Sequence, residues 1–238
     1  MRLLRQAWLL TRSELRQELR DLELLLTAGF FSLLMLAMFG LSFTTLPRAE
    51  SHLIAVPGLL WMSIAFVGSL TLTRAFDRER EADTLRALLV APVDRIAIYL
   101  AKAALTLTVL LLSCAVLVPG LMLLFPVARE FAARPFESVA LVVLGCLGYV
   151  AVGTLFAAGL STSSGKNVLV SIILFPLTTP VLIYNLVATR TLLDGHPAFA
   201  TYLGKMLALD VVLVAVAALM FESVLVGSKT QQPPRRRR

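Results

Sequence analysis

The sequence predicts an all-α, polytopic membrane protein with six transmembrane helices and an amphipathic interfacial helix at its amino terminus. Three observations support this fold class. Hydrophobic residues make up 58% of the 238 residues, and the mean hydropathy is +0.84, whereas soluble domains lie nearer about 45–50%. The apolar residues form long blocks without alternation, which favours helices over a barrel. Lys and Arg residues collect mainly between alternate blocks.

The amino-terminal residues 1–22 predict an amphipathic helix, because their apolar and basic residues separate at a helical period. The apolar residues share one face: Leu4, Trp8, Leu15, Leu19 and Leu22. The arginines share another: Arg5, Arg12, Arg16 and Arg20. We expect this helix to lie in the membrane interface, with arginines near headgroups. The alternative is a cytoplasmic helix packed on neighbouring protein.

Six apolar blocks follow, and each is long enough for a span, because a bilayer core of roughly 30 Å needs about 20 helical residues. The blocks cover residues 24–46, 54–76, 100–125, 138–162, 168–189 and 204–226. They leave no room for a sizeable soluble domain. We therefore expect one transmembrane domain over residues 1–226 and a basic cytoplasmic tail over residues 227–238.

Charge predicts the orientation of these spans. An even number of spans places both termini on one side, and that side carries 17 of the 22 Lys and Arg residues. Since Lys and Arg collect on the cytoplasmic side, we expect both termini in the cytoplasm. The net charge of +7 therefore reflects topology and does not indicate a nucleic-acid partner. For the tail Arg235–Arg238, contact with anionic lipid and a solvated end are both open interpretations.

The connection after the second span is a charged, helix-forming block, residues 77–92, with the sequence DREREADTLRALLVAP. Proline disfavours helix at the residue before it, so a helix is expected to end near Val90. Either the block is a solvated loop, or it is a lever whose apolar strip docks on a cytoplasmic ATPase while its charges select the partner. The residues assigned to this coupling are Phe76, Asp77, Glu81, Asp83, Leu85, Leu88, Leu89 and Pro92.

Two features stand out inside the later spans. Pro176 and Pro180 lie four residues apart in the fifth span, so they predict a helix bend, either static or used in movement. Asp210 lies about two turns into the last span, where a charge points to a proton or substrate role. Alternatively Asp210 lies near the outer interface, and Lys205 is a candidate partner.

Sites for catalysis or firmly bound cofactors are not evident. His52 and His196 lie on outer connections, where haem ligation is the less favoured interpretation. Cys114 and Cys146 lie within spans and are expected to be buried small hydrophobes, without disulfide or metal. The stretch STSSGKN, residues 161–167, lacks the spacing of a phosphate-binding loop. A cleavable signal peptide is not expected, and the chain is expected to be non-catalytic.

Three stretches resemble a known family. They are VPGLLWMSIAFVGSL (Val56–Leu70), RAFDREREADTLRALLVAPVDRIAIYLAKA (Arg74–Ala103) and SIILFPLTTPVLIY (Ser171–Tyr184). With the amphipathic helix and six spans, they resemble an ABC-2-type permease, and more narrowly the haem exporter protein B family (CcmB) of c-type cytochrome maturation. The resemblance runs over nearly the whole chain.

The resemblance implies partners and a cellular setting. The chain would be a multi-pass permease of the bacterial inner membrane, present as two copies with two CcmA ATPase subunits, which bind the ATP. CcmC, CcmD and the haem chaperone CcmE would join the complex, with haem as a transported or handled ligand. ATP hydrolysis would drive haem export or release of haem-loaded CcmE. The alternatives are an ABC-2 permease for a lipid or drug, an ATPase-independent carrier, and a passive scaffold.

Overall fold

The computed structural model describes residues 2–44, 49–81, 94–161 and 167–227, and every element in these ranges is helical. The all-α prediction is therefore confirmed for this part of the chain. The elements are α1 (Arg2–Asp21), α2 (Glu23–Met35), η1 (Leu36–Gly40), α3 (Leu41–Thr44), α4 (Ala49–Glu81), α6 (Arg95–Leu124), η2 (Pro126–Arg129), α7 (Glu130–Ala133), α8 (Pro135–Ser161), α9 (Asn167–Leu193) and α10 (Phe199–Gly227).

Within the described residues, four helices are long and apolar enough to cross a membrane. They are α4, α6, α8 and α10, which contain the segments His52–Arg74, Ile96–Leu124, Pro135–Ala158 and Phe199–Phe221. Helices α1 and α2 meet the same test only as a pair that is bent by 68°. Helix α9 carries the predicted block 168–189, but the side chains of residues 167–175 lie outside the described part. A multi-pass membrane protein is thus supported, and the count of six spans stays a prediction.

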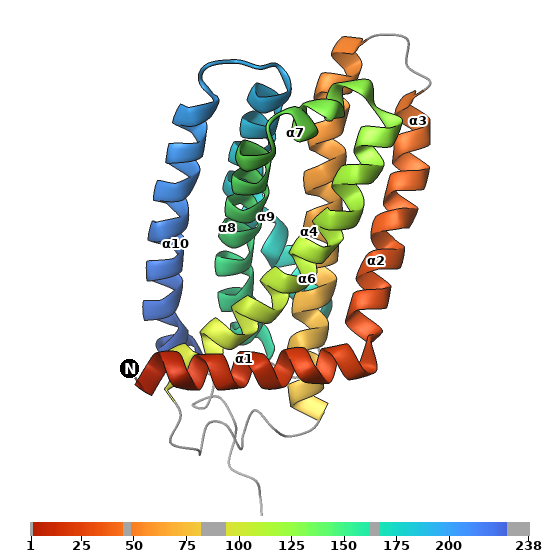
Figure 1. Ribbon diagram of the computed structural model, residues 1–238. Helices are drawn as coiled ribbons and strands as arrows, with labels where there is room; N and C mark the ends of the chain where they lie inside the picture. Colours follow the sequence, from red (N-terminus) through yellow and green to blue (C-terminus); the bar gives the residue numbers. More distant parts are fainter. Residues whose placement is uncertain (1, 45–48, 82–93, 162–166, 228–238) are drawn as a thin grey trace, which may run out of the picture.

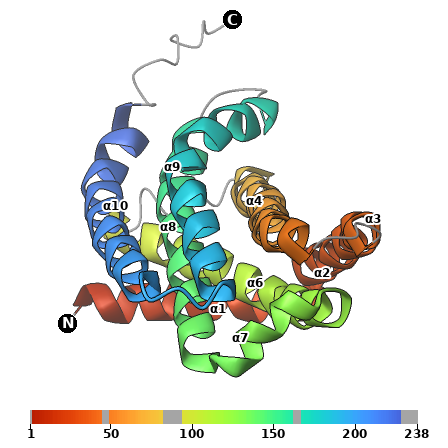
Figure 2. The same cartoon turned by 90° about the horizontal axis from the view of Figure 1, so that it is seen from above.

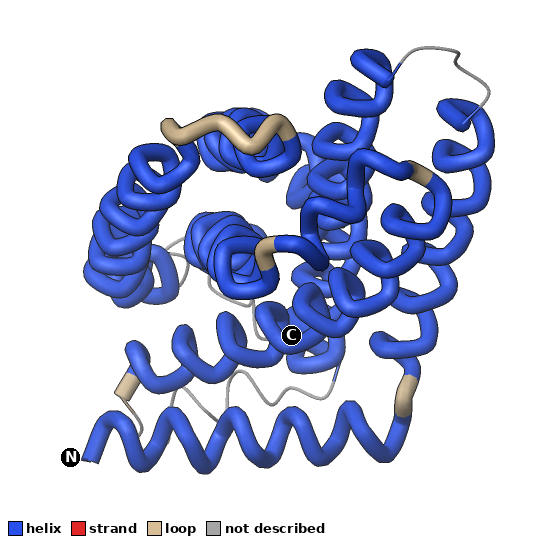
Figure 3. Tube along the Cα trace, turned by 45° about the horizontal axis from the view of Figure 1, so that its top comes forward, coloured by secondary structure: helices blue, strands red, loops and turns tan. Residues whose placement is uncertain are grey.

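The long helices α2, α4, α6, α8, α9 and α10 run side by side as a bundle, and α1 lies across one end of it (Figure 1). Helix α8 contacts α4, α6, α9 and α10, and the view along the bundle shows it among them (Figure 2). The described connections lie at the ends of the bundle (Figure 3). We call the end crossed by α1 the α1 end and the opposite end, which carries α7, the α7 end.

Helix α1 has one face against the bundle and another face exposed. Ala7 and Glu18 are buried, whereas Trp8 and Leu19 from the predicted apolar face are 66% and 63% exposed. The predicted apolar face therefore points away from the protein, where it is available to a membrane. The opposite face of α1 packs against other helices of the same chain, chiefly α6. The interfacial location itself stays a prediction.

The core joins α4, α8 and α9 through a chain of buried hydrogen bonds. The indole Nε1 of Trp61 donates to Thr189 Oγ1 at 2.7 Å, and that hydroxyl donates to the Asn185 carbonyl at 2.7 Å. The side-chain amide of Asn185 in turn donates to the Gly145 carbonyl at 3.2 Å. Inside a bilayer no water competes for these groups, so each must find its partner within the protein.

Two glycines let aromatic rings lie directly on a neighbouring helix backbone. A Cβ atom added to Gly145 would lie 2.0 Å from Trp61 Cη2, and one added to Gly68 would lie 2.3 Å from Tyr149 Cε1. Tyr149 uses this close approach to donate its hydroxyl to the Ala65 carbonyl at 2.8 Å. Small residues at membrane helix contacts allow this kind of packing. Close packing drives the association of helices in a membrane, because apolar side chains gain little by leaving lipid.

The close contact between Gly145 and Trp61 predicts that Gly145→Ala destabilises the bundle. The new methyl group must displace a large buried ring, and overpacking of this kind costs about 1–3 kcal/mol. We expect thermal unfolding in detergent to begin several degrees lower. The control is Gly204→Ala, where a Cβ meets nothing within 4 Å, so a neutral or slightly stabilising effect is expected. Equal shifts for the two variants would contradict this packing.

Candidate functional site

The predicted coupling segment, residues 77–92, begins on α4 and ends just before α6. Helix α4 continues to Glu81, so the expected helical continuation of the second span is confirmed as far as that residue. Phe76, Asp77 and Glu81 lie on this last part of α4, where only the backbone is described. The other assigned residues lie outside the described part: Asp83, Leu85, Leu88, Leu89 and Pro92. Their coupling role stays a prediction.

Helix α1 is tied to the start of α6, directly after the coupling segment. The Asp94 backbone amide donates to Gln6 Oε1 at 3.2 Å. Two helical turns further along both helices, Lys102 Nζ pairs with Glu14 Oε1 at 2.9 Å. The two contacts have the same residue spacing on each helix, which corresponds to a length of about 12 Å at 1.5 Å per residue. Helix α1 and the start of α6 therefore run parallel over this length.

The ion pair between Glu14 and Lys102 is largely shielded from solvent. The Lys102 side chain is only 5% exposed and the Glu14 side chain 18%. Small buried residues beside it, Ala97 and Ala101 of α6 and Ala7 of α1, let the two backbones approach closely. A buried pair of this kind is costly to break, because removal of one partner leaves a desolvated charge. It therefore fixes α1 to α6 more firmly than an exposed pair would.

A tight turn at Leu22 joins α1 to α2 at the 68° bend. Leu22 has a φ of 54°, which is unusual for a residue with a bulky side chain. The side chain of Glu18, which is 2% exposed, compensates. Its Oε1 accepts from the backbone amides of Leu24 at 2.7 Å and Leu25 at 3.3 Å. These amides have no partner within α2, and a carboxylate is favoured at a helix amino terminus.

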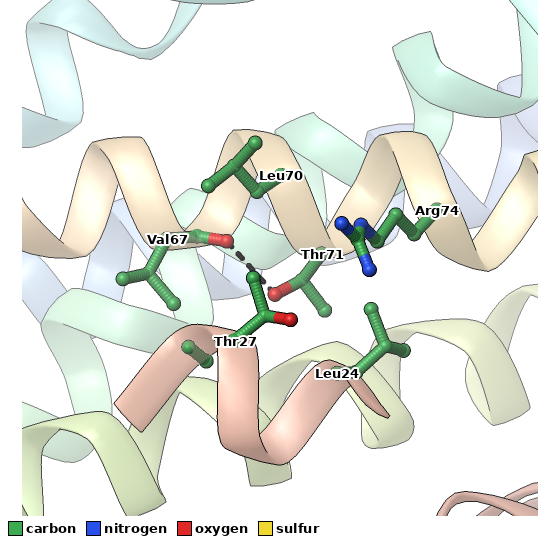
Figure 4. A pocket seen from close by; sticks show the side chains of 7 residues that line it. Leu24, Thr27, Val67, Leu70, Thr71 and Arg74 are labelled. Atoms are coloured by element: carbon green, nitrogen blue, oxygen red, sulfur yellow. Dashed lines mark hydrogen bonds between the residues drawn. The ribbon is translucent and has the colours of Figure 1, made fainter. Parts of the chain in front are cut away.

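Helix α2 is in turn tied to the last part of α4. Arg74 Nη1 pairs with Glu23 Oε1 at 2.5 Å, with side chains 42% and 64% exposed. Next to this pair, Leu24 and Thr27 face Thr71 across the contact, as Figure 4 shows. The space between them is about 10 Å³, which is room for at most about one water molecule. The two helices are thus packed closely and leave no ligand site there.

These four contacts connect the flanks of the coupling segment into one unit, which we call the α1-end ring. Starting at α6, the ring passes through Gln6–Asp94 and Glu14–Lys102 to α1, through the Glu18 cap to α2, and through Glu23–Arg74 to α4. The chain of residues 82–93 then joins α4 back to α6. Both described flanks of this segment are therefore linked to α1 and α2 by these contacts.

Sequence reasoning missed the acidic residues that build this ring. It considered only the apolar and basic faces of α1. A usable signal was present, because Ala7, Glu14 and Glu18 are spaced by seven and four residues and so share a third face. The structure buries part of this face against α6. The spacing alone did not reveal that Lys102 is the partner of Glu14.

The structure describes the intramembrane candidates without testing their roles. Pro176 and Pro180 both lie inside α9, and movement at a bend there stays a prediction.

Asp210 is 3% exposed and eleven residues beyond the start of α10, which argues against a position at the interface. The Asp210 carboxylate lies against Gly148 of α8, where an added Cβ atom would be 2.3 Å from Asp210 Oδ1. The Asp210 Oδ2 atom has no hydrogen-bond partner among the described residues, and the Lys205 ammonium lies 5.2 Å from the Tyr202 ring centre, so the suggested pair is not formed in this structure.

The histidines and cysteines have local structural contacts. His52 packs edge-on against Phe125 with ring centres 5.2 Å apart, and His196 Nδ1 accepts the Ala198 amide at 3.1 Å. Cys114 and Cys146 are buried, as expected. Their sulfur atoms are 3.8 Å apart, too far for a disulfide bond.

The ion pairs of the α1-end ring are expected to differ in strength. In double-mutant cycles in detergent, Glu14→Gln with Lys102→Met should give a coupling energy of roughly 1–3 kcal/mol. The matched cycle of Glu23→Gln with Arg74→Met should give less than about 1 kcal/mol, because that pair is exposed. The measurement is the free energy of unfolding for each variant. Indistinguishable coupling energies would show that burial does not strengthen the α1–α6 contact.

Comparison with known proteins agrees with this architecture. The family described as ABC-2 type transporter matches residues 5–184, a range that includes most of α1, the predicted coupling segment and both prolines of α9. No curated protein matches the chain. The matched range covers most of the chain and contains every contact of the α1-end ring. The chain therefore belongs to the ABC-2 type transporter family and is a membrane permease subunit of an ABC transporter.

Proposed function

We propose that this permease works with an ATPase subunit that docks on residues 77–92, and that the α1-end ring distributes the resulting movement. The observation that carries the proposal is the series of contacts that links the two flanks of that segment through α1 and α2. A permease of this family implies an ABC ATPase partner. When the partner binds more tightly to one conformation of the segment, that difference in binding energy shifts the conformations of the helices.

The orientation in this proposal places the α1 end in the cytoplasm. Basic residues of the described part gather there, on α1, at the end of α4 and near the start of α6: Arg5, Arg12, Arg16, Arg20, Arg74 and Lys102. This gathering supports a cytoplasmic location by the positive-inside rule. The nucleotide and its ATPase are then on the same side as the coupling segment. The membrane is proposed to be the bacterial inner membrane.

At a finer level, we propose a role in c-type cytochrome maturation. The support is the resemblance of three stretches, above all SIILFPLTTPVLIY (Ser171–Tyr184), to the haem exporter protein B family. In this proposal two copies assemble with two CcmA ATPases, together with CcmC, CcmD and CcmE. Haem is then a handled ligand rather than a resident cofactor. The sequence has only two tryptophans, Trp8 and Trp61, which favours conformational coupling over a tryptophan-rich haem site.

Two other functions have an observation in their favour. Membership of the ABC-2 type transporter family fits export of another substrate, such as a lipid or drug, equally well. An ATPase-independent carrier would use an intramembrane ionisable group, and the buried Asp210 is a candidate. Purification of the tagged protein in a gentle detergent distinguishes the carrier from the permeases, since only the permeases retain an ATPase subunit.

The coupling role predicts that Glu81→Lys and Leu88→Asp leave the protein in the membrane but uncouple the ATPase. Reversed charge or lost apolar docking should weaken a central contact enough to lower coupled activity about tenfold. The measurement is ATPase-dependent transport or cytochrome maturation at matched protein levels. Asp194→Lys, the same kind of charge reversal in the exposed α9–α10 connection, is the control. Full activity in both test variants would overturn the coupling role.

The cytochrome role predicts that deletion of the gene abolishes covalent c-type cytochromes while b-type cytochromes persist. The reason is that only c-type maturation needs the proposed release of haem-loaded chaperone. Haem staining of denatured membrane proteins measures the c-type products, and an intact copy of the gene should restore them. Normal c-type cytochromes in the deletion strain, with an ATPase still co-purifying, would favour export of another substrate.

A further inference from the structure

A large apolar cavity lies between α6 and α8, beneath α7. Its volume is about 640 Å³, and its walls are almost entirely hydrocarbon. Representative lining residues are Leu111, Val118 and Met122 of α6, Phe131 of α7, and Val142 of α8. This space is separate from the α1-end ring, which none of these residues joins.

The cavity offers no free hydrogen-bonding side chain. Its two lining residues with polar atoms are Ser138 and Cys114. The Ser138 hydroxyl donates within the turn before α8, where the carbonyls of Phe131 and Arg134 lie 3.0 and 2.8 Å away. The Cys114 thiol contacts Cys146 Sγ at 3.8 Å. A ligand that fills this cavity therefore gains contacts of the dispersion type only, and must itself be apolar.

The cavity faces the region that a bilayer would occupy. Helices α6 and α8 both contain candidate spans. The lining residue Val139 is 63% exposed, and its neighbour Phe136 is 90% exposed. On α6, Leu112 and Leu123, which follow the lining residues Leu111 and Met122 in the sequence, are 48% and 87% exposed. Apolar side chains this exposed on membrane-crossing helices lie against lipid, so the cavity opens sideways to the acyl chains.

Size and charge identify the occupant. The cavity, with a volume of about 640 Å³, has ample room for a hydrocarbon chain. Arg129 and Glu130 directly precede the lining residue Phe131, at the depth where the spans end. The guanidinium of Arg129 is exposed and has no ion-pair partner among the described residues. It is thus available to a phosphate.

We propose that this cavity holds one acyl chain of a membrane phospholipid, with the phosphate group at Arg129. Apolar transfer gives little energy here, because lipid tails are as apolar as the cavity walls. Retention comes instead from close packing along the chain and from the charged contact at Arg129. The lipid then separates α6 from α8 near the α7 end. This inference does not depend on the proposed substrate or ATPase partner.

The first test is native mass spectrometry of the purified full-length chain after extensive detergent washing. We expect one retained phospholipid per copy in the natural sequence. Ala115→Phe fills the cavity and should lower the occupancy at least fivefold, and Arg129→Ala should lower it less. The control is Ala208→Phe, an exposed alanine of α10 outside the cavity, which should keep the lipid. Equal retention in Ala115→Phe and Ala208→Phe would overturn the proposal.

The second test uses the natural sequence, so it holds even if a variant fails to fold. A phospholipid with a photoreactive group midway along one chain is added to liposomes that contain the protein. Cross-links should concentrate on residues 111–122 and 131–143. An even spread that includes Leu207 and Leu219 of α10 would indicate ordinary surrounding lipid and overturn the proposal. Disulfide-linked dimers through Val139→Cys, without cavity cross-links, would assign the cavity to a second copy and equally overturn it.

Discussion

Inside a bilayer, a buried polar group has no water to bind, and this constraint governs the whole structure. Backbone amides satisfy it through long helices. The aromatic side chains satisfy it by reaching a neighbouring helix, where Trp61 meets Thr189, Tyr149 meets the Ala65 carbonyl and Tyr99 meets a carbonyl of α8. Such contacts need close helix approach, and glycines lie opposite the rings of Trp61 and Tyr149. Helix positions are thus fixed by a few polar contacts within an otherwise uniform apolar surface.

The two ends of the bundle differ in their contacts. At the α1 end, carboxylates form ion pairs and a helix cap with neighbouring helices. At the α7 end, the described part of α6 and α8 diverges around an apolar cavity with no free polar group. The first arrangement is suited to transmit displacement between helices. The second offers space for the proposed acyl chain between α6 and α8.

The ring also makes α1 a structural part of the coupling region. A buried pair joins Glu14 to α6, and a buried carboxylate, Glu18, fixes the turn into α2. The predicted membrane-facing residues, such as Trp8, remain exposed on the other side. The sequence interpretation offered an interfacial helix and a helix packed on neighbouring protein as alternatives. In the structure, one face of α1 packs on the bundle and another is exposed, so the two kinds of contact use different faces.

The sequence by itself determined that the chain forms long apolar helices, because the length of an apolar block and its helical period depend only on residues that are close in the sequence. It also predicted the burial of Cys114 and Cys146. Tertiary structure alone decided which residues meet, since Trp61 and Thr189 are 128 positions apart and a period does not identify a partner on another helix. For the same reason Lys102 counted in the sequence only as a cytoplasmic charge, and Lys205, a candidate partner of Asp210, instead lies near the Tyr202 ring. Partner choice depends on helix rotation and register, which packing sets.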